Sequence, residues 1–188
     1  MKNSTKNLLQ RFLKNDATTL LLRLALLYIL WFLCRIVFYL QNAGLVGPLE
    51  WNEIPGLLRG AGMFDTASIL YVNALFILLS LLPFRFRETR RYQRILCWLY
   101  TVTNALALIV NSADGIYFHY ARKRFTSDEL SYLHNNDNTG TVVLKGLAEN
   151  WYIVLWCALL IAAMVWVYRR IKAMPTRIEN RWAYFGIN

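Results

Sequence analysis

Four long apolar stretches, separated by polar or basic sequence, dominate this chain. The fourth, at 151–168, contains no charged residue, and those at about 17–40, 64–82 and 95–117 are of similar length. A stretch of about 18 or more apolar residues suffices to cross a hydrocarbon core roughly 30 Å thick. Because backbone polar groups in that core must satisfy their own hydrogen bonds, each stretch is expected to form a helix. The pattern predicts an all-α, polytopic membrane helix bundle with four spans.

The polar segments divide the chain around an expected transmembrane domain at 17–173. Residues 1–16 form a basic lead. A basic tail at 174–188 ends in the apolar and aromatic run RWAYFGIN, which is typical of the start of a span. The loop at 41–63 is rich in Gly and Pro, and the loop at 119–150 is long and polar. The sequence therefore predicts four complete spans and the start of a possible fifth.

Charge differs between the segments that join the spans. The lead, the turn at 84–94 and the tail are densely basic, whereas the 41–63 and 119–150 loops mix acidic and basic residues. Short cytoplasmic segments of membrane proteins carry an excess of Lys and Arg. We therefore expect a multi-pass protein whose N-terminus, 84–94 turn and C-terminus lie in the cytoplasm. Both longer loops are expected to face outward.

The composition fits a membrane protein, since 57% of the residues are hydrophobic. The net charge of +10 is also compatible with binding to nucleic acid. However, the basic residues gather in the short segments between spans, where they set topology and complement anionic phospholipid headgroups. The expected partners are therefore the lipid bilayer and anionic phospholipid headgroups, and not nucleic acid.

Five polar side chains in or beside the spans are expected to gather at the outer membrane surface. Arg35 lies near the outer end of the first span, where Asp65 or Asp114 could pair with it. Asn111 and Asp114 lie one helical turn apart, and Arg124 follows just outside the bilayer. Charges inside membranes are costly, so they are usually paired or functional. Two interpretations stay open: a structural ion-pair network, and a site whose arginines bind a phosphate headgroup.

Three further polar residues within the spans have expected structural roles. Arg23 lies near one end of the first span, and we expect its side chain to snorkel to the cytoplasmic interface. Asn73 and Asn104 lie within the second and third spans. Because amides in membrane helices bond across helices, these two are expected to donate and accept interhelical hydrogen bonds.

The residue types that carry catalysis or hold metals form no recognisable pattern in this sequence. His119 and His134 are separated by a spacing that matches no zinc site. Cys34, Cys97 and Cys157 each lie in an apolar stretch and are expected to pack as small hydrophobic residues. The sequence contains neither a glycine-rich phosphate loop nor a nucleophile elbow. It therefore predicts no catalytic, cofactor-binding or metal-ligating residue in this chain.

Four short motifs occur in a familiar order. They are FD at 64–65, LLP at 81–83, N-x-x-D-x-x-Y-F at 111–118, and KRFT at 123–126. In this order they resemble the N-terminal transmembrane region of the lipoteichoic acid synthase-like family, the sulfatase-fold phosphoglycerol or phosphoethanolamine transferases. The resemblance extends over essentially the whole chain.

The resemblance implies a bacterial cytoplasmic (inner) membrane protein with five membrane helices followed by a large extracytoplasmic domain. In the family, that domain carries a threonine nucleophile and a divalent metal, usually manganese. It moves a headgroup from a phospholipid to a glycan or lipid acceptor. This sequence stops as the fifth helix begins, so no nucleophile or metal ligand can be carried over. We therefore expect the membrane anchor of such an enzyme, inactive by itself, with manganese only in the missing catalytic domain.

Two other functions stay open. The chain could be a stand-alone four-helix membrane scaffold or regulatory protein that acts through partner subunits. A transporter or channel ranks last, because the sequence shows no internal repeat and no sign of the broken helix pair that builds a midplane site.

Overall fold

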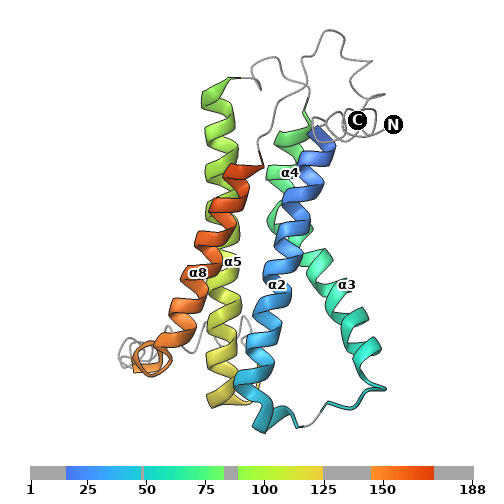
Figure 1. Cartoon of the computed structure of the whole chain (residues 1–188), viewed down its shortest axis with the longest axis vertical. Coiled ribbons are helices and arrows are strands. Elements are labelled where there is room, and N and C mark those ends of the chain that lie inside the picture. Colours follow the sequence, from blue (N-terminus) through green and yellow to red (C-terminus); the bar gives the residue numbers. More distant parts are fainter. Residues whose placement is uncertain (1–15, 48, 83–88, 125–144, 172–188) are drawn as a thin grey trace, which may run out of the picture.

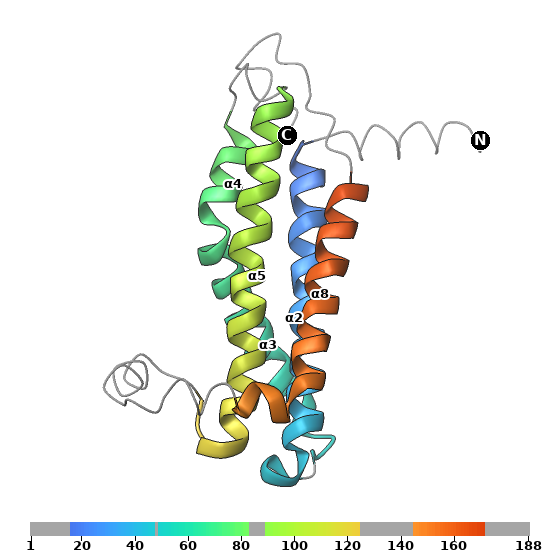
Figure 2. The ribbon, with the colours of Figure 1, turned by 90° about the vertical axis from the view of Figure 1, so that its left-hand side faces the viewer.

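The computed structural model describes residues 16–47, 49–82, 89–124 and 145–171, and their regular secondary structure is helical. The main helices, in chain order, are α2 (Asp16–Val46), α3 (Ile54–Val72), α4 (Ala74–Leu81), α5 (Arg90–Ala121) and α8 (Trp151–Arg170). A short helical segment at 145–149 precedes α8. The helices α2, α5 and α8 run lengthwise beside one another, and α3 and α4 cover one side of α2 and α5 (Figures 1 and 2).

Three helices, α2, α5 and α8, are each long and apolar enough to cross a membrane. The pair α3 and α4 passes the same test when it is taken as one broken span. Large apolar side chains such as Leu21 and Ile29 are exposed on the outside of the bundle, where lipid would cover them. The predicted all-α membrane bundle is confirmed. The lead at 1–15 and the tail at 172–188, with its possible fifth span, lie outside the described residues.

The second span differs from the prediction in both its start and its continuity. We expected it at 64–82, after a Gly- and Pro-rich loop, but α3 already begins at Ile54. Pro55 lies in its first turn, where proline is tolerated because the N–H there has no helical partner. The helix then breaks at Asn73, and α4 continues at an angle of 62°. This bent pair also corrects the expectation that the chain has no broken helix pair.

The other helices extend beyond their predicted spans. The first span was expected at 17–40 and the third at 95–117, whereas α2 and α5 are 31 and 32 residues long. Thr89 caps the start of α5 by accepting a hydrogen bond from the backbone N–H of Tyr92 at 3.3 Å. At the other end, Arg122 takes a left-handed conformation with φ of 56°, which stops the helix and turns the chain.

An aromatic and apolar core joins all the main helices. Phe76, Tyr100 and Tyr168 stack in sequence, with ring centroids 5.1 and 4.8 Å apart. Tyr100 also donates a hydrogen bond from its hydroxyl to the backbone carbonyl of Arg23 at 2.9 Å. We expected the Arg23 side chain to snorkel to the interface, but it is packed inside the bundle and is only 5% exposed. Its guanidinium lies over the Tyr168 ring at 3.9 Å and donates to the carbonyl of Ile171, beyond the end of α8, at 3.3 Å.

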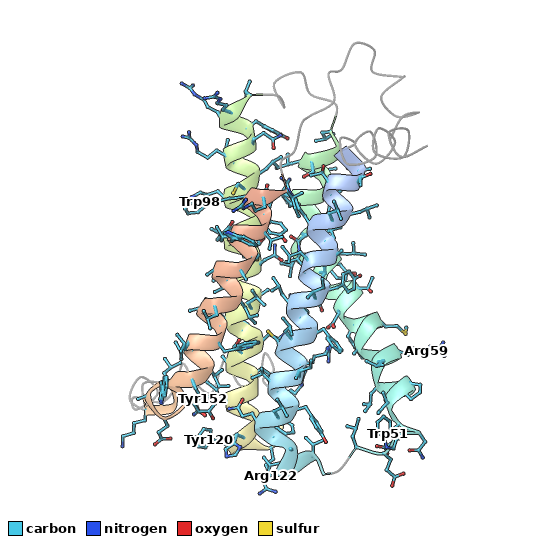
Figure 3. The ribbon with its side chains drawn as sticks, in the orientation of Figure 1. Trp51, Arg59, Trp98, Tyr120, Arg122 and Tyr152 are labelled. Atoms are coloured by element: carbon cyan, nitrogen blue, oxygen red, sulfur yellow. The ribbon has the colours of Figure 1, made fainter. Side chains whose placement is uncertain are left out.

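The two ends of the bundle differ in charge. The arginine-rich end, where α5 begins and α8 ends, carries Arg90, Arg91, Arg94, Arg169 and Arg170. At the mixed-charge end, where α2 and α5 end and α3 and α8 begin, basic residues stand beside Glu50, Glu53 and Glu149. Figure 3 shows Trp51, Tyr120, Arg122 and Tyr152 at the mixed-charge end and Trp98 towards the other. Such rings favour the level of lipid headgroups.

Candidate functional site

The first element of the candidate site is a two-point ion pair between α2 and α3. Arg35 donates from Nε to Asp65 Oδ2 at 3.0 Å and from Nη2 to Asp65 Oδ1. The side chain of Asp65 is 9% exposed and that of Arg35 is 32% exposed. Arg35 lies six residues before Gln41, which bonds Asn150 at the start of α8. It therefore lies about 9 Å from that level along the helix. The pair fixes α3 to α2 within the apolar part of the bundle.

The second element is a more exposed ion pair nearer the mixed-charge end. Arg124 Nε lies 3.3 Å from Asp114 Oδ2, and the two side chains are 53% and 12% exposed. The turn at Arg122 leads the chain back towards α5 and α2, so that the Arg124 guanidinium also lies 4.9 Å from the centre of the Phe38 ring. This pair offers a guanidinium that water or a ligand can reach.

The five side chains singled out from the sequence all line one half-open cavity of about 810 Å³ between α2, α3 and α5. These are Arg35, Asp65, Asn111, Asp114 and Arg124. Its apolar wall includes Trp31, Phe64, Leu106 and Val110. Figure 1 shows α3 leaning away from α2 towards the mixed-charge end. A polar cluster beside an apolar wall suits an amphipathic ligand.

A buried amide pair joins the broken span to α5. Asn73 Nδ2 donates to Asn104 Oδ1 at 3.0 Å, and Asn104 Nδ2 donates to Asn73 Oδ1 at 2.8 Å. Each amide also bonds the carbonyl four residues earlier in its own helix, and both residues are fully buried. The interhelical hydrogen bonds predicted for these two residues are confirmed. The pair also lies at the break itself, which the sequence did not reveal.

A second cavity, which sequence reasoning missed, lies between α2, α5 and α8. It measures about 580 Å³, and its lining includes Gln41, His119, Asn150 and Tyr152. Gln41 donates to Asn150 Oδ1 at 3.4 Å, and the Tyr152 hydroxyl donates to the same oxygen at 3.1 Å. His119, which lies beside the end of a predicted span, was the sequence signal available for this cavity. The sequence could not reveal the cavity, because the residues around His119 come from distant parts of the chain.

Within the described ranges, no group of three or more His, Cys, Asp or Glu side chains is placed to hold a metal ion. Cys34, Cys97 and Cys157 are free thiols, and the first and third are buried. His134 lies outside the described residues. The candidate site therefore consists of ion pairs, amides and an apolar wall.

The comparisons with known proteins identify no family. No family model matches the chain, and neither the curated proteins nor the solved structures contain a match. The resemblance to the lipoteichoic acid synthase-like family therefore stays a prediction from four short motifs, and the site must be interpreted from its own geometry.

Proposed function

We propose that this chain is the membrane-anchor domain of a sulfatase-fold phosphoglycerol or phosphoethanolamine transferase that acts on cell-envelope lipid or glycan. The observation that carries the proposal is the 810 Å³ cavity lined by two arginines and two aspartates. Such a cavity between membrane helices, with charged groups in its half nearer the mixed-charge end, can hold a phospholipid headgroup beside a catalytic domain. The motif order at 64–65, 81–83, 111–118 and 123–126 supports the choice of enzyme family.

The proposal includes an orientation in the bacterial cytoplasmic membrane. The arginine-rich end faces the cytoplasm, since Lys and Arg concentrate on that side of membrane proteins. The mixed-charge end, with the candidate cavity, then faces outward, and the N-terminus lies inside. A catalytic domain attached after the spans would meet its lipid donor at the outer face.

The role assigned to the cavity is binding and orientation. Guanidinium groups hold phosphate oxygens with two donors in a fixed geometry. The apolar wall beside them can accept an acyl chain. The bond-breaking chemistry belongs, in this proposal, to the separate catalytic domain and its divalent metal.

The break between α3 and α4 favours a second candidate, a transporter, because discontinuous helices often build substrate sites near the bilayer midplane. At this break, however, the amides of Asn73 and Asn104 bond one another and backbone carbonyls. Groups that are already paired in this way hold the bend in place, so we favour the anchor.

The size of the native product tests the proposal directly. An epitope tag at the N-terminus, introduced at the chain's own locus, would be followed by blotting of membranes. A band several tens of kilodaltons above the 22.0 kDa of this chain is expected for an anchor joined to a catalytic domain. A band at 22.0 kDa would contradict it and favour the stand-alone scaffold, whose partner subunits would be sought by co-purification.

Cysteine labelling tests the orientation. In a background where the three native cysteines are replaced by alanine, Arg59→Cys and Arg90→Cys place single thiols at exposed positions near opposite ends. A membrane-impermeant maleimide should label Arg59→Cys in intact cells and Arg90→Cys only after lysis. The reverse pattern would contradict the proposed orientation.

A further inference from the structure

The arginine-rich end of the bundle presents positive charge that no described carboxylate neutralises. Its exposed guanidinium groups include those of Arg91 and Arg94 near the start of α5, and of Arg169 and Arg170 at the end of α8. Across the described ranges, none of these side chains takes part in an ion pair. The first turn of α5 contains no acidic residue, and the helix dipole adds partial positive charge there. The counter-charge is therefore expected from outside these two helices.

The chain next to these helices in sequence adds to this positive charge. The segments at 83–88 and 172–188, which adjoin α5 and α8, each contain more basic than acidic residues. At the mixed-charge end, by contrast, Arg124 lies against Asp114. The arginine-rich end therefore carries an excess of formal positive charge, which favours an anionic partner.

The exposed face of α5 combines this charge with apolar surface. Arg91, Arg94, Ile95 and Trp98 recur at the spacing of one helix face, and all four are exposed. Trp98 is 70% exposed and lies four residues from Arg94, which is about 6 Å along the helix axis. Figure 3 shows Trp98 on the outside of α5, near the level at which α8 ends. Guanidinium groups followed by an indole ring match the order of headgroup and upper acyl chain in a bilayer.

The neighbouring helix repeats this arrangement. The Arg170 guanidinium lies 5.1 Å from the centre of the Trp166 ring, and Trp166 is 60% exposed. Because α8 packs along α5, two pairs of arginines stand on adjacent helices, each pair beside an exposed tryptophan (Figure 2). We call these side chains the arginine–tryptophan surface: Arg91, Arg94 and Trp98 of α5, and Trp166, Arg169 and Arg170 of α8.

We propose that the arginine–tryptophan surface binds a phospholipid with two phosphate groups, as in cardiolipin, one phosphate at each helix. Two guanidinium groups are then available to each phosphate, and the acyl chains lie along the tryptophan rings. A lipid with one phosphate would leave the arginines of one helix without a counter-charge. A zwitterionic lipid brings its own cation, which the arginines repel. The proposal does not depend on the transferase assignment.

Competition at equal phosphate tests this selection. The full chain, purified in detergent, would be mixed with half as many molecules of tetraoleoyl cardiolipin as of dioleoyl phosphatidylglycerol, which equalises phosphate groups and oleoyl chains. The retained lipids would be counted by native mass spectrometry. We expect cardiolipin to be retained about tenfold more per phosphate, because its second phosphate makes further charge-assisted contacts. Both ends of the bundle are accessible in detergent, so the result does not depend on orientation.

Two double variants assign the contacts to the two helices. Arg91→Gln with Arg94→Gln removes the guanidinium groups of α5, and Arg169→Gln with Arg170→Gln removes those of α8. Each should bring the retention of cardiolipin close to that of phosphatidylglycerol, since only one phosphate can then be held. All four side chains are exposed, so both variants are expected to fold. Size-exclusion chromatography would verify this.

A matched control separates this surface from the net charge of the protein. Arg59→Gln with Arg122→Gln removes the same charge from exposed arginines nearer the opposite end (Figure 3). This variant should keep the wild-type preference for cardiolipin, because the arginine–tryptophan surface is intact.

Three results would overturn the proposal: equal retention of the two lipids per phosphate by the wild-type chain, an unchanged preference in either site variant, or an equal loss of preference in the control. The wild-type ratio decides the question even where a variant is not monodisperse. The outcome is separate from that of the native-size experiment. A 22.0 kDa product that retains cardiolipin would remove the transferase proposal and leave this surface.

Discussion

Replacing Arg35 with alanine should loosen the attachment of α3 to the bundle. Arg35 and Asp65 form the ion pair that joins α2 to α3, and the carboxylate is 9% exposed. In Arg35→Ala the carboxylate loses both hydrogen bonds while it remains largely out of water. The variant therefore removes an attraction and also leaves a charge poorly solvated.

The size of the effect follows from the burial of the two partners. Removing one member of a fully buried pair costs about 3–5 kcal/mol, whereas an exposed pair contributes about 0–1 kcal/mol. Because Arg35 is 32% exposed and Asp65 is nearly buried, we expect a loss of about 2–3 kcal/mol in the free energy of unfolding. For a chain of this length, that corresponds to a melting midpoint lower by about 5–10 °C.

The assay is the loss of monodisperse protein on heating in detergent, followed by size-exclusion chromatography. Arg35→Ala combined with Asp65→Asn should recover about half of the lost midpoint, because the second change removes the uncompensated charge. The matched control is Arg59→Ala, an exposed arginine that points away from the bundle in Figure 3, and its midpoint should be unchanged. A wild-type midpoint for Arg35→Ala, or no recovery in the double variant, would refute the reasoning.

Three further predictions concern the interior of the bundle. Asn73→Leu should lower the free energy of unfolding, measured by thermal unfolding in detergent, by about 1–2 kcal/mol because it deprives the Asn104 amide of its partner on the neighbouring helix. Asn73→Leu with Asn104→Leu should be less harmful, and a double variant worse than the single one would argue against this. Tyr100→Phe should cost about 1 kcal/mol in chemical unfolding through loss of its hydrogen bond to the Arg23 carbonyl, and an unchanged transition would contradict this. Gly115→Leu should reduce folded yield while Gly115→Ala is tolerated, since a Cβ there would meet Gln41 Oε1 at 3.3 Å, and equal yields would disprove this close approach.

The sequence allowed the membrane bundle and the members of the candidate cluster to be predicted for a simple physical reason. Charges are rare in apolar spans, so Arg35, Asp65 and Asp114 stand out without any knowledge of the fold. The depth of each charge in the bilayer limited the set of its possible ion-pair partners, since residues at the same level of different spans can meet. The choice of Asp65 over Asp114 for Arg35 required the packing of α3 against α2.

The broken span could not be predicted in the same way. The Gly- and Pro-rich segment at 54–63 has a low helix propensity, which favoured a loop in the sequence analysis. In the structure this segment is part of a helix that lies at 62° to α4. At the bend lies the amide pair between Asn73 and Asn104, two residues far apart in the chain. Such a contact leaves no local signature in the sequence.

The tilt of α3 has a consequence for the surrounding bilayer. Because α3 leans outward at the mixed-charge end, the helices that the structure describes spread more widely there than at the arginine-rich end (Figure 1). These described helices would therefore displace more lipid area from one leaflet than from the other. Neighbouring copies in a flat bilayer would touch first at their wide ends, and a row of them would bend the membrane away from that leaflet. The tilt of one helix would thus couple the crowding of these bundles to the curvature of the membrane that contains them.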